Sequence, residues 1–333
     1  MHKEFLMGNA AIALGAVAAG VNVVAGYPGT PSTEVLETIA KHRPDDVYVE
    51  WSVNEKAAME LAAGASYAGA RSMVTMKQVG LNVASDPLMS LEYVGIKGGM
   101  VILVADDPGP ISSQTEQDTR HFSRFSKLPC FDPSSAQEAY EMIQEAFEYS
   151  EKYGTPVFLR PTTRVCHGYA SIMVKDETEY THHQPEGFIK DSKRWVIFPR
   201  LSFMNHKKIE ARNQELSDIF SSYEKNTIHP SCDAFKDSKK GIATGGISYT
   251  YTMETLKKTG MVKTLKIATP HPFPEKLAVD FLSGLDEVLC LEELDPVIER
   301  ELIYICGKYH LPTRINGKLS GHTACAGENT RDS

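Results

Sequence analysis

The sequence lacks the short motifs that mark several common kinds of active site. Its 333 residues contain no GxxxxGK[ST] phosphate loop, no GxGxxG turn, no GxSxG nucleophile turn and no HExxH helix motif. Each of these motifs fixes a backbone or a side chain where its chemistry needs it. Their absence argues against the usual nucleotide-binding, serine hydrolase and zinc protease functions.

Paired cysteines are also lacking. Six cysteines are scattered along the chain, and no two of them form a CxxC pair. Close pairs are typical of zinc sites and of iron–sulfur ligand runs, so neither is expected within this chain. Separate thiols in an otherwise ordinary composition favour a reducing, cytoplasmic location.

An excess of positive charge and a long apolar run are missing as well. Lys and Arg number 35 against 43 Asp and Glu, a net charge of −8, which argues against a nucleic-acid-binding surface. The most apolar stretch, residues 1–26, is interrupted by Glu4, Asn9 and Asn22. It predicts a helix over 8–19 that ends at Gly20, not a leader or a membrane span. We therefore expect neither nucleic acid nor a membrane as partner.

Short apolar runs do alternate with helical patterns. The predicted strands of the first half are 21–26, 47–51, 72–76, 100–106 and 155–160. The predicted helices are 8–19, 31–41, 54–70, 86–95 and 135–150. This alternation predicts an α/β fold with largely parallel sheets flanked by helices.

The length favours about two domains. We predict a first domain over 1–168 and a polar connector over 169–240 that carries an exposed helix at 205–226. A second, smaller α/β domain follows over 241–318, with a strand at 241–246 and a helix at 248–259. The tail, 319–333, is short of apolar residues and is predicted to be a disordered end or a cut at a domain boundary.

The stretch "YPGTPST" (27–33) follows the first predicted parallel strand. Proline fixes φ and glycine permits positive φ, so a stiff turn is expected. Ser32 and Thr33 are candidate caps for the next helix. The alternative is a ligand site, because strand carboxyl ends and helix N-termini face the crevice of α/β sheets. Thr30 would then offer a hydroxyl to a substrate oxygen.

Glu55 opens the predicted helix in "EWSVNEKAAMELAAGASYAGAR" (50–71). Ser52 and Glu55 have the spacing of a capping box, which is a purely structural role. The other interpretation is a catalytic acid. The alanine-rich helix behind it allows close packing, and a glutamate held out of water there could carry a proton near neutral pH. The residues alone leave both roles open.

Two further strand ends carry polar residues. In "MKQVGLNVASDPLMS" (76–90), Lys77 and Gln78 end a strand, Gly80 and Asn82 are expected to turn the chain, and Asp86 with Pro87 would begin a helix. The segment 105–131 is a long polar loop with several acids, and such loops are often functional. The acids fit no spaced ligand signature and are expected to be solvated, so no metal is predicted.

The ordered blocks of this sequence resemble a known family. They are "MGNAAIALGAVAAGVNVVAGYPGTPSTEV", "EWSVNEKAAMELAAGASYAGARSMVTMKQVGLNVASDPL", "VILVADDPGPISSQTEQDTRHFSRFSKLP", "TPVFLRPTTRVCH" and "VLCLEELDPVIERELI". Together they are similar to the N-terminal half of the alpha (large) subunit of the indolepyruvate:ferredoxin oxidoreductases. The resemblance implies a thiamine diphosphate pyrimidine-binding (Pyr) domain followed by a domain like the C-terminal domain of transketolase.

The family chemistry assigns roles to residues of this chain. Members oxidatively decarboxylate arylpyruvates, pass the product to coenzyme A and send electrons through iron–sulfur clusters to ferredoxin. Glu55 matches the glutamate that hydrogen-bonds the aminopyrimidine ring and so promotes loss of the thiazolium C2 proton. Thr30 matches a threonine that contacts substrate, and Gly29 replaces a bulkier residue of pyruvate-using relatives, which leaves room for a larger side chain. The expected cofactor-binding residues are Glu55, Gly29, Thr30, Gly80 and Asn82, and the expected substrate-binding residues are Thr30, Lys77, Gln78 and Gln117.

The family's large subunit continues into a diphosphate-binding (PP) domain with a magnesium motif and into a [4Fe-4S] cluster domain, and neither pattern occurs here. The resemblance therefore implies a partial chain that is inactive alone. The implied partners are the beta (small) subunit, ferredoxin, coenzyme A, an arylpyruvate and a second copy in a homodimer. Two other functions remain open: a non-oxidative thiamine diphosphate-dependent 2-oxoacid decarboxylase subunit, and a non-catalytic scaffold that binds a partner.

Overall fold

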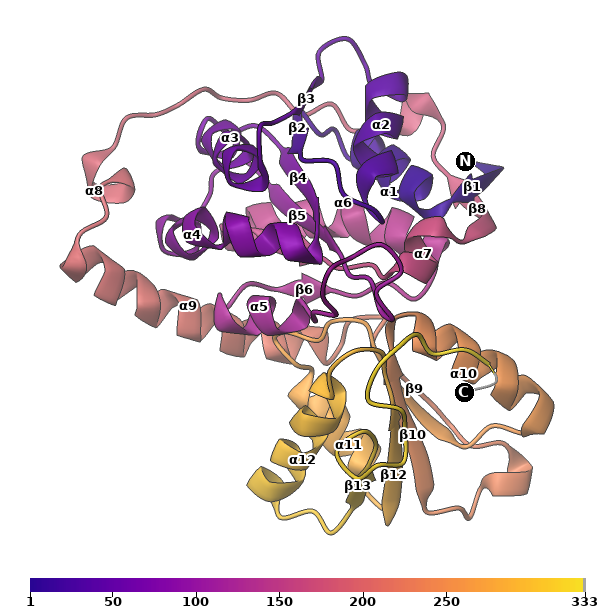
Figure 1. The fold of residues 1–333 in the computed structure, drawn as a ribbon. Helices are drawn as coiled ribbons and strands as arrows, with labels where there is room; N and C mark the ends of the chain where they lie inside the picture. Colours follow the sequence, from indigo (N-terminus) through magenta and orange to yellow (C-terminus); the bar gives the residue numbers. More distant parts are fainter. Residues whose placement is uncertain (332–333) are drawn as a thin grey trace.

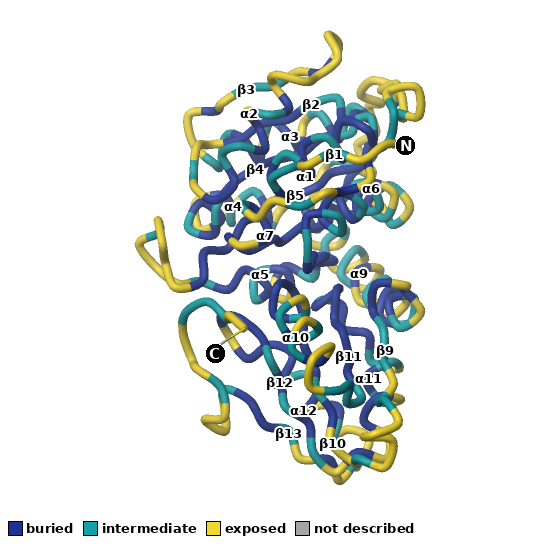
Figure 2. Tube along the Cα trace, turned by 90° about the vertical axis from the view of Figure 1, so that its right-hand side faces the viewer, coloured by how far each residue is buried: buried dark blue, intermediate teal, exposed yellow. Residues whose placement is uncertain are grey.

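A computed structural model describes residues 1–331 as two α/β units, one above the other in Figure 1. Each unit has its own sheet, and a two-stranded ribbon adjoins the first unit. Figure 2 shows buried residues concentrated in the sheets and in the helices that face them. No helix within residues 1–331 is both long and apolar enough to cross a membrane.

The first sheet is entirely parallel, as the sequence predicted. Its strand order is β3-β2-β4-β5-β7-β6. The strands are β2 (Val23–Gly26), β3 (Tyr48–Trp51), β4 (Ser72–Lys77), β5 (Met100–Ala105), β6 (Cys130–Phe131) and β7 (Val157–Leu159). Because all of them run the same way, their carboxyl ends share one edge. That edge receives the polar loops singled out above.

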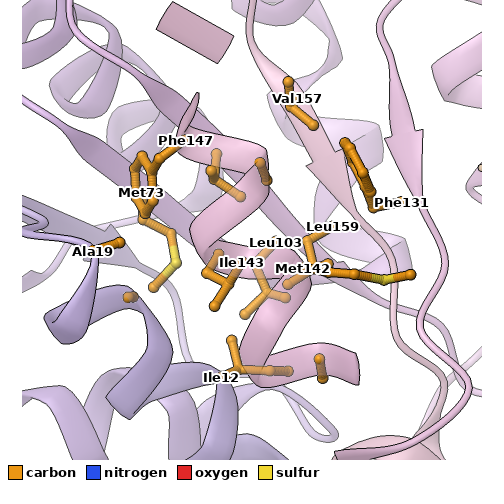
Figure 3. Close-up of a cluster of buried hydrophobic side chains, with 14 of the residues drawn as sticks. Ile12, Ala19, Met73, Leu103, Phe131, Met142, Ile143, Phe147, Val157 and Leu159 are labelled. Atoms are coloured by element: carbon orange, nitrogen blue, oxygen red, sulfur yellow. The ribbon is translucent and has the colours of Figure 1, made fainter. Parts of the chain in front are cut away.

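Helices cover both faces of this sheet. The helices α1 (Gly8–Ala18), α2 (Thr33–His42) and α6 (Ala136–Tyr153) share one hydrophobic cluster, and α3 (Glu55–Tyr67) and α4 (Gln78–Val94) share the other. Neighbouring strand residues alternate between the clusters, as a period of two requires. Figure 3 shows part of the first cluster, with Ile12 of α1 and Ile143 of α6 near Met73 of β4.

The strand order creates a crevice between β2 and β4. From β2 the chain crosses through α2 on one face to β3, and from β4 it crosses through α4 on the opposite face to β5. Adjacent strands whose connections leave in opposite directions form a topological switch point, where α/β sheets bind ligands. The loop after β2 and the start of α4 border this position.

The sequence did not predict the antiparallel ribbon. Strand β1 (His2–Met7) pairs with β8 (Tyr169–Val174) along six residues. A short helix, α7 (Thr163–His167), leads into β8. Strand β1 precedes the first helix with no turn residue between them, and β8 lies in the segment predicted to be connector. Neither stretch has a local sequence pattern that predicts a strand, and each is a strand only because it pairs with the other.

The rest of the connector is more ordered than its polarity suggested. It contains the short helices η1 (Glu177–Glu179) and α8 (Ser192–Trp195) and the long helix α9 (Pro199–Phe220), which runs along the base of the first unit toward the second in Figure 1. The predicted helix, 205–226, is shifted because Pro199 takes its first turn, where proline is favoured. Ile209, Leu216 and Phe220 bury its packing face.

The second sheet has the order β13-β12-β10-β11-β9. All of its pairs are parallel except that of the edge strand β9 with β11. The strands are β9 (Thr227–His229), β10 (Lys240–Gly245), β11 (Lys263–Ile267), β12 (Glu287–Leu291) and β13 (Arg314–Asn316). The helices are η2 (Asp233–Phe235), α10 (Gly246–Thr259), α11 (Glu275–Leu282) and α12 (Val297–Tyr309).

A buried ion-pair network joins the two units. Arg120, at the start of α5 (Arg120–Phe125), donates from Nε to Asp118 at 2.9 Å and from Nη1 to Glu292 of the second unit at 2.8 Å. Glu292 also accepts the first backbone N–H groups of α12. Arg160, after β7, donates to Asp106 at 2.7 Å. The network therefore fixes the two units to each other through their charged side chains.

The prediction that the acids of the 105–131 loop are solvated is wrong for three of them. Asp106, Asp107 and Asp118 are 0%, 1% and 7% exposed. Burial raises the pKa of Asp118, but the Arg120 and Arg160 guanidinium groups outweigh burial and hold that pKa well below its ordinary value. The arginines that compensate these charges are thus what permits their burial.

Glu293, beside this network, gives a pH-dependent prediction. Burial raises its pKa to about 7, although the Asn329 backbone N–H and Arg160 oppose the shift. A carboxyl whose pKa is higher in the folded state loses stabilisation as pH rises from its unfolded value toward 7. Glu293→Gln keeps an oxygen acceptor, and because glutamine does not ionise, this position loses no folding stability as pH rises. We expect the variant to be more stable than wild type at pH 8 by up to about 3 kcal/mol and equally stable at pH 4. Urea unfolding at both pH values measures the difference, and an equal difference at both would contradict the assignment.

Candidate functional site

Four segments converge at the carboxyl edge of the first sheet. They are the loop after β2, the first turn of α3, the first turn of α4 and the loop that follows β5. Each follows a parallel strand of the same sheet, so the topology brings them together. All the predicted site residues lie on these four segments.

The loop after β2 is held by its own hydroxyl groups. Thr33 Oγ1 accepts a hydrogen bond from Gly29 N at 2.9 Å, and Ser32 Oγ donates to the Gly29 carbonyl at 3.0 Å. Neither hydroxyl caps α2, so the predicted capping role is wrong for both. The bonds instead fix the backbone around Gly29 and leave Thr30 exposed at the rim of the crevice.

Lys77 packs directly against this loop. A Cβ added at Gly29 would lie 3.0 Å from Lys77 Cγ and 3.3 Å from its Cδ. Such a distance is tighter than ordinary van der Waals contact, so a larger residue at position 29 would push the lysine stem. Gly29 therefore sets how closely the loop approaches the end of β4.

The expected turn at Gly80 and Asn82 does not exist. Helix α4 begins at Gln78, directly after β4, and both residues lie in its first turns. The predicted cap at Asp86 is also wrong, because Pro87 lies inside the helix. Since Val83, the residue four positions before Pro87, is 48% exposed, water can solvate the carbonyl that the proline leaves without a donor.

Gln78 offers an unused acceptor inside the site. Its side chain is fully buried, and Nε2 donates to the Thr115 carbonyl at 3.3 Å. Its Oε1 atom is buried without a hydrogen-bond partner. A buried polar atom without a partner is costly, and such atoms are expected where a ligand supplies the missing group.

Glu55 is the first residue of α3, and its predicted capping box is wrong. Asn54 is the N-cap, and its side chain accepts the Ala57 backbone N–H at 2.9 Å. Ser52 donates instead to Glu50 at 2.8 Å. Because Asn54 serves the helix end, the Glu55 carboxylate has no capping duty and is free for another role.

The Glu55 carboxylate lies over Gly80 of α4. A Cβ added at Gly80 would come within 2.5 Å of Glu55 Oε1 and 2.7 Å of its Cγ. Glycine at position 80 therefore makes the space that the carboxylate occupies. Glu55 is half-buried in this chain, so the expected burial behind the alanine-rich helix is only partly present. Gly64, on the same helix, faces open space.

The loop after β5 closes the crevice on the remaining side. Asn82 Nδ2 donates to Gln117 Oε1 at 3.1 Å, which joins two predicted site residues. Ser112 Oγ donates to the Thr30 carbonyl at 3.3 Å, and Asp107 accepts the Ser112 N–H at 2.9 Å. Sequence reasoning missed Ser112 and Asp107. Their only signal was their place in a long polar loop.

One group of side chains within residues 1–331 has the spacing of metal ligands. Ligand atoms of Asp118, His121 and Asp295 lie within 4.8 Å of one another. Asp118 is already paired with Arg120, and His121 Nε2 lies 2.8 Å from Asp295 Oδ2. Because these atoms are used in ion pairs at the junction of the units, the group carries no metal proposal.

The arrangement is suited to hold a polar ring and an anion. A carboxylate lies in a glycine-lined space, an amide oxygen lacks a partner, and an ammonium and hydroxyl groups line the same edge. A carboxylate so placed can share a proton with a ring nitrogen. These residues could hold the aminopyrimidine ring of a cofactor beside a 2-oxo acid.

Comparison with known proteins identifies relatives of this chain. Residues 14–229 match the model of a family described as pyruvate flavodoxin/ferredoxin oxidoreductase, thiamine diP-binding. The chain is 43% identical over 324 residues to indolepyruvate oxidoreductase subunit IorA of Methanothermobacter thermautotrophicus, which covers 96% of this chain and 51% of the relative. The chain spans about half the length of these curated relatives.

Solved structures share the fold. A 2-oxoglutarate:ferredoxin oxidoreductase from Magnetococcus marinus superposes with a TM-score of 0.75 at 17% identity, over 95% of this chain and 62% of that chain. A split-gene transketolase superposes with a TM-score of 0.59 at 14% identity, over 93% and 87% of the two chains. The predicted α/β fold with two largely parallel sheets is confirmed.

Proposed function

Because this chain belongs to the pyruvate flavodoxin/ferredoxin oxidoreductase family, in its thiamine diphosphate-binding part, we propose that it supplies the pyrimidine-binding side of a 2-oxoacid:ferredoxin oxidoreductase. The proposed reaction is oxidative decarboxylation of indolepyruvate or another arylpyruvate, with the acyl product passed to coenzyme A and electrons to ferredoxin. The 43% identity to an indolepyruvate oxidoreductase subunit supports this substrate class.

The observation that carries the proposal is the Glu55 carboxylate in the space left by Gly80. It lies at the switch point of a parallel sheet and has no capping duty. A carboxylate in this position can share a proton with a nitrogen of the cofactor's pyrimidine ring. The half-buried position agrees with a site that is closed by a further domain.

The residues of this chain would bind and orient both ligands. Thiamine diphosphate, when bound, supplies the electron sink for decarboxylation. Glu55 would hold the ring proton, Gly80 would make room for the Glu55 carboxylate, and Gly29 and Asn82 would border the ring. Thr30, Lys77, Gln78 and Gln117 would contact the 2-oxo acid. The Lys77 ammonium favours an anionic substrate, and the buried Gln78 Oε1 can accept only from an N–H or O–H group of a ligand.

We place the rest of the machinery in other polypeptide segments. Magnesium with the diphosphate-binding (PP) domain, and the [4Fe-4S] clusters, would belong to the half of the relatives that this chain does not span. The proposed partners are the small subunit, ferredoxin and a second copy of the chain, in a reducing cytoplasm. Residues 1–333 alone would therefore not turn over. A monomer at all concentrations in sedimentation would contradict the dimer.

The direct test is reduction of methyl viologen by the complete enzyme, large and small subunits together. The reaction would contain indolepyruvate, coenzyme A, thiamine diphosphate and magnesium. Dye reduction that depends on thiamine diphosphate would support the proposal. Carbon dioxide release without dye reduction would favour a decarboxylase. If neither carbon dioxide nor reduced dye formed, the remaining function would be that of a non-catalytic scaffold.

Gly80→Ala tests the position of Glu55 without removing it. The added methyl would push the flexible end of the Glu55 side chain, while alanine suits the helix interior. We expect stability to be kept and dye reduction by the complete enzyme to fall about 100-fold, since small misplacements of catalytic groups cost that much. Gly64→Ala, in open space on α3, is the matched control and should keep full activity. Equal activity of both variants would show that Glu55 does not need this position.

A further inference from the structure

A cavity lies beside Thr30, at the carboxyl edge of the first sheet. Its volume is about 250 Å³, and its walls include Thr30, Ser112, Arg164, His167 and Glu328. Arg164 and His167 come from α7, at the end of the first unit, and Glu328 comes from the chain segment after β13. None of these three residues belongs to the crevice loops. Because Thr30 lies on both rims, a ligand in the crevice can extend into this cavity.

Arg164 already holds a carboxylate in this cavity. Its Nε atom lies 3.0 Å from each oxygen of Glu328, and Nη2 lies 2.6 Å from Oε2. The planar guanidinium group matches a carboxylate in this forked geometry, which makes arginine the preferred residue for such recognition. The Arg164 side chain remains 51% exposed, so a ligand can reach it.

The other charged groups of the cavity do not pair with the Arg164 guanidinium group. Asp107, the remaining anion on the wall, accepts from Thr163 Oγ1 at 2.8 Å and from Ser112 N at 2.9 Å. Those bonds satisfy it without Arg164. His167 Nε2 is buried without a hydrogen-bond partner, and the closest carboxylate oxygen, of Glu34, is 3.7 Å away. The cavity thus offers one cation, the Arg164 guanidinium group, while His167 Nε2 is shielded from it.

Glu328 is held in the cavity by few contacts of its own segment. Its neighbours Gly327 and Asn329 donate backbone N–H groups to Glu116 at 2.8 Å and to Glu293 at 3.0 Å. The segment forms no helix or strand. The Glu328 side chain is 14% exposed and the Arg164 side chain 51%, so the pair is open to solvent on the arginine side, where a second carboxylate can compete for the guanidinium group.

We propose that Arg164 binds the carboxylate of the anionic substrate, a 2-oxo acid, in this cavity, and that Glu328 occupies the same position when substrate is absent. The proposal rests on the proposed function for the identity of the acid. Thr30 and Ser112, which line the same cavity, would then lie beside the remaining oxygens of the substrate. Glu328 would act as a competing carboxylate within the same chain.

The test uses a carboxylate that cannot react. Isothermal titration of the 333-residue chain with 3-(indol-3-yl)propionate measures binding without turnover, and the neutral 3-(indol-3-yl)propanamide controls for the ring. Arg164→Met should weaken carboxylate binding about 10–100-fold, the range expected for losing charge-assisted hydrogen bonds. Glu328→Gln should strengthen it about two- to fivefold, since it removes the competing charge within the chain. Arg124→Met, at an arginine that is paired with Glu301 away from the cavity, should change nothing.

Several results would overturn the proposal. They are equal binding of the amide and the acid, wild-type affinity in Arg164→Met, or no binding even in Glu328→Gln. The proposed function fails differently. If the complete enzyme reduces dye with an aliphatic 2-oxo acid and not with indolepyruvate, the substrate assignment is wrong. A rise in KM for that acid in Arg164→Met would still support the carboxylate site.

Discussion

Glu55→Gln is expected to lower dye reduction by the complete enzyme about 10²–10⁴-fold, the range found for removing a general acid or base. Glutamine keeps the size of the side chain and fits the space over Gly80, but it cannot exchange a proton with a ring nitrogen. The helix should be unaffected because Asn54, not Glu55, is its N-cap. The loss should therefore appear in kcat, with little change in the folded fraction or the denaturant midpoint.

Glu60→Gln is the matched control. It makes the same chemical change on the same helix, at a position exposed to solvent. We expect full activity from this variant. If Glu55→Gln were as active as Glu60→Gln, Glu55 would be an ordinary surface residue, and the proposed catalytic role would be wrong.

Arg120→Met is expected to destabilise the chain by about 3–5 kcal/mol, because it leaves buried anions without their cation. Asp118 and Glu292 are both nearly fully buried, and Arg120 also donates to the carbonyl oxygens of Glu293 and Asp295. Methionine occupies much of the space of the Arg120 side chain but cannot donate any of these hydrogen bonds. The denaturant midpoint of the 333-residue chain, followed by circular dichroism, measures the loss. We expect the second unit to separate from the first at lower denaturant than in wild type.

Two further variants control this prediction. Arg124→Met removes an exposed arginine of the same helix that pairs with Glu301 of the second unit. Its midpoint should stay close to wild type, since exposed ion pairs contribute about 0–1 kcal/mol. Arg120→Lys keeps the positive charge but loses the planar guanidinium group with its several donors. Its denaturant midpoint should lie between those of wild type and Arg120→Met. Equal midpoints for Arg120→Met and Arg124→Met would mean that the network does not hold the units together.

The sequence predicted the elements whose signal is local. Every predicted strand of the first sheet is confirmed within a few residues, because each is a short apolar run between turn signals. Strands β1 and β8 were missed because each is defined by the other, more than 160 residues away. The start of α4 was missed because Gly80 suggested a turn. The structure uses that glycine for the space that Glu55 fills.

The candidate site was predicted in part for a physical reason. Thr30, Glu55 and Gln117 follow parallel strands and Lys77 ends one, and the carboxyl ends of parallel strands share one edge. The buried state of Asp118 was not predictable from the loop alone, because the second of its two cations, Arg160, follows a different strand. Arg164 and Glu328 are also distant in sequence. Only the folded chain shows that they meet beside Thr30.

Glu55 is proposed to control the proton of bound thiamine diphosphate. The most direct measurement is the rate of hydrogen–deuterium exchange at C2 of the thiazolium ring, followed by acid quench and proton NMR, in the complete enzyme without substrate. We predict that wild type exchanges about 100-fold or more faster than Glu55→Gln, with Glu60→Gln equal to wild type. Equal exchange rates in wild type and Glu55→Gln, with cofactor bound to both, would contradict this account.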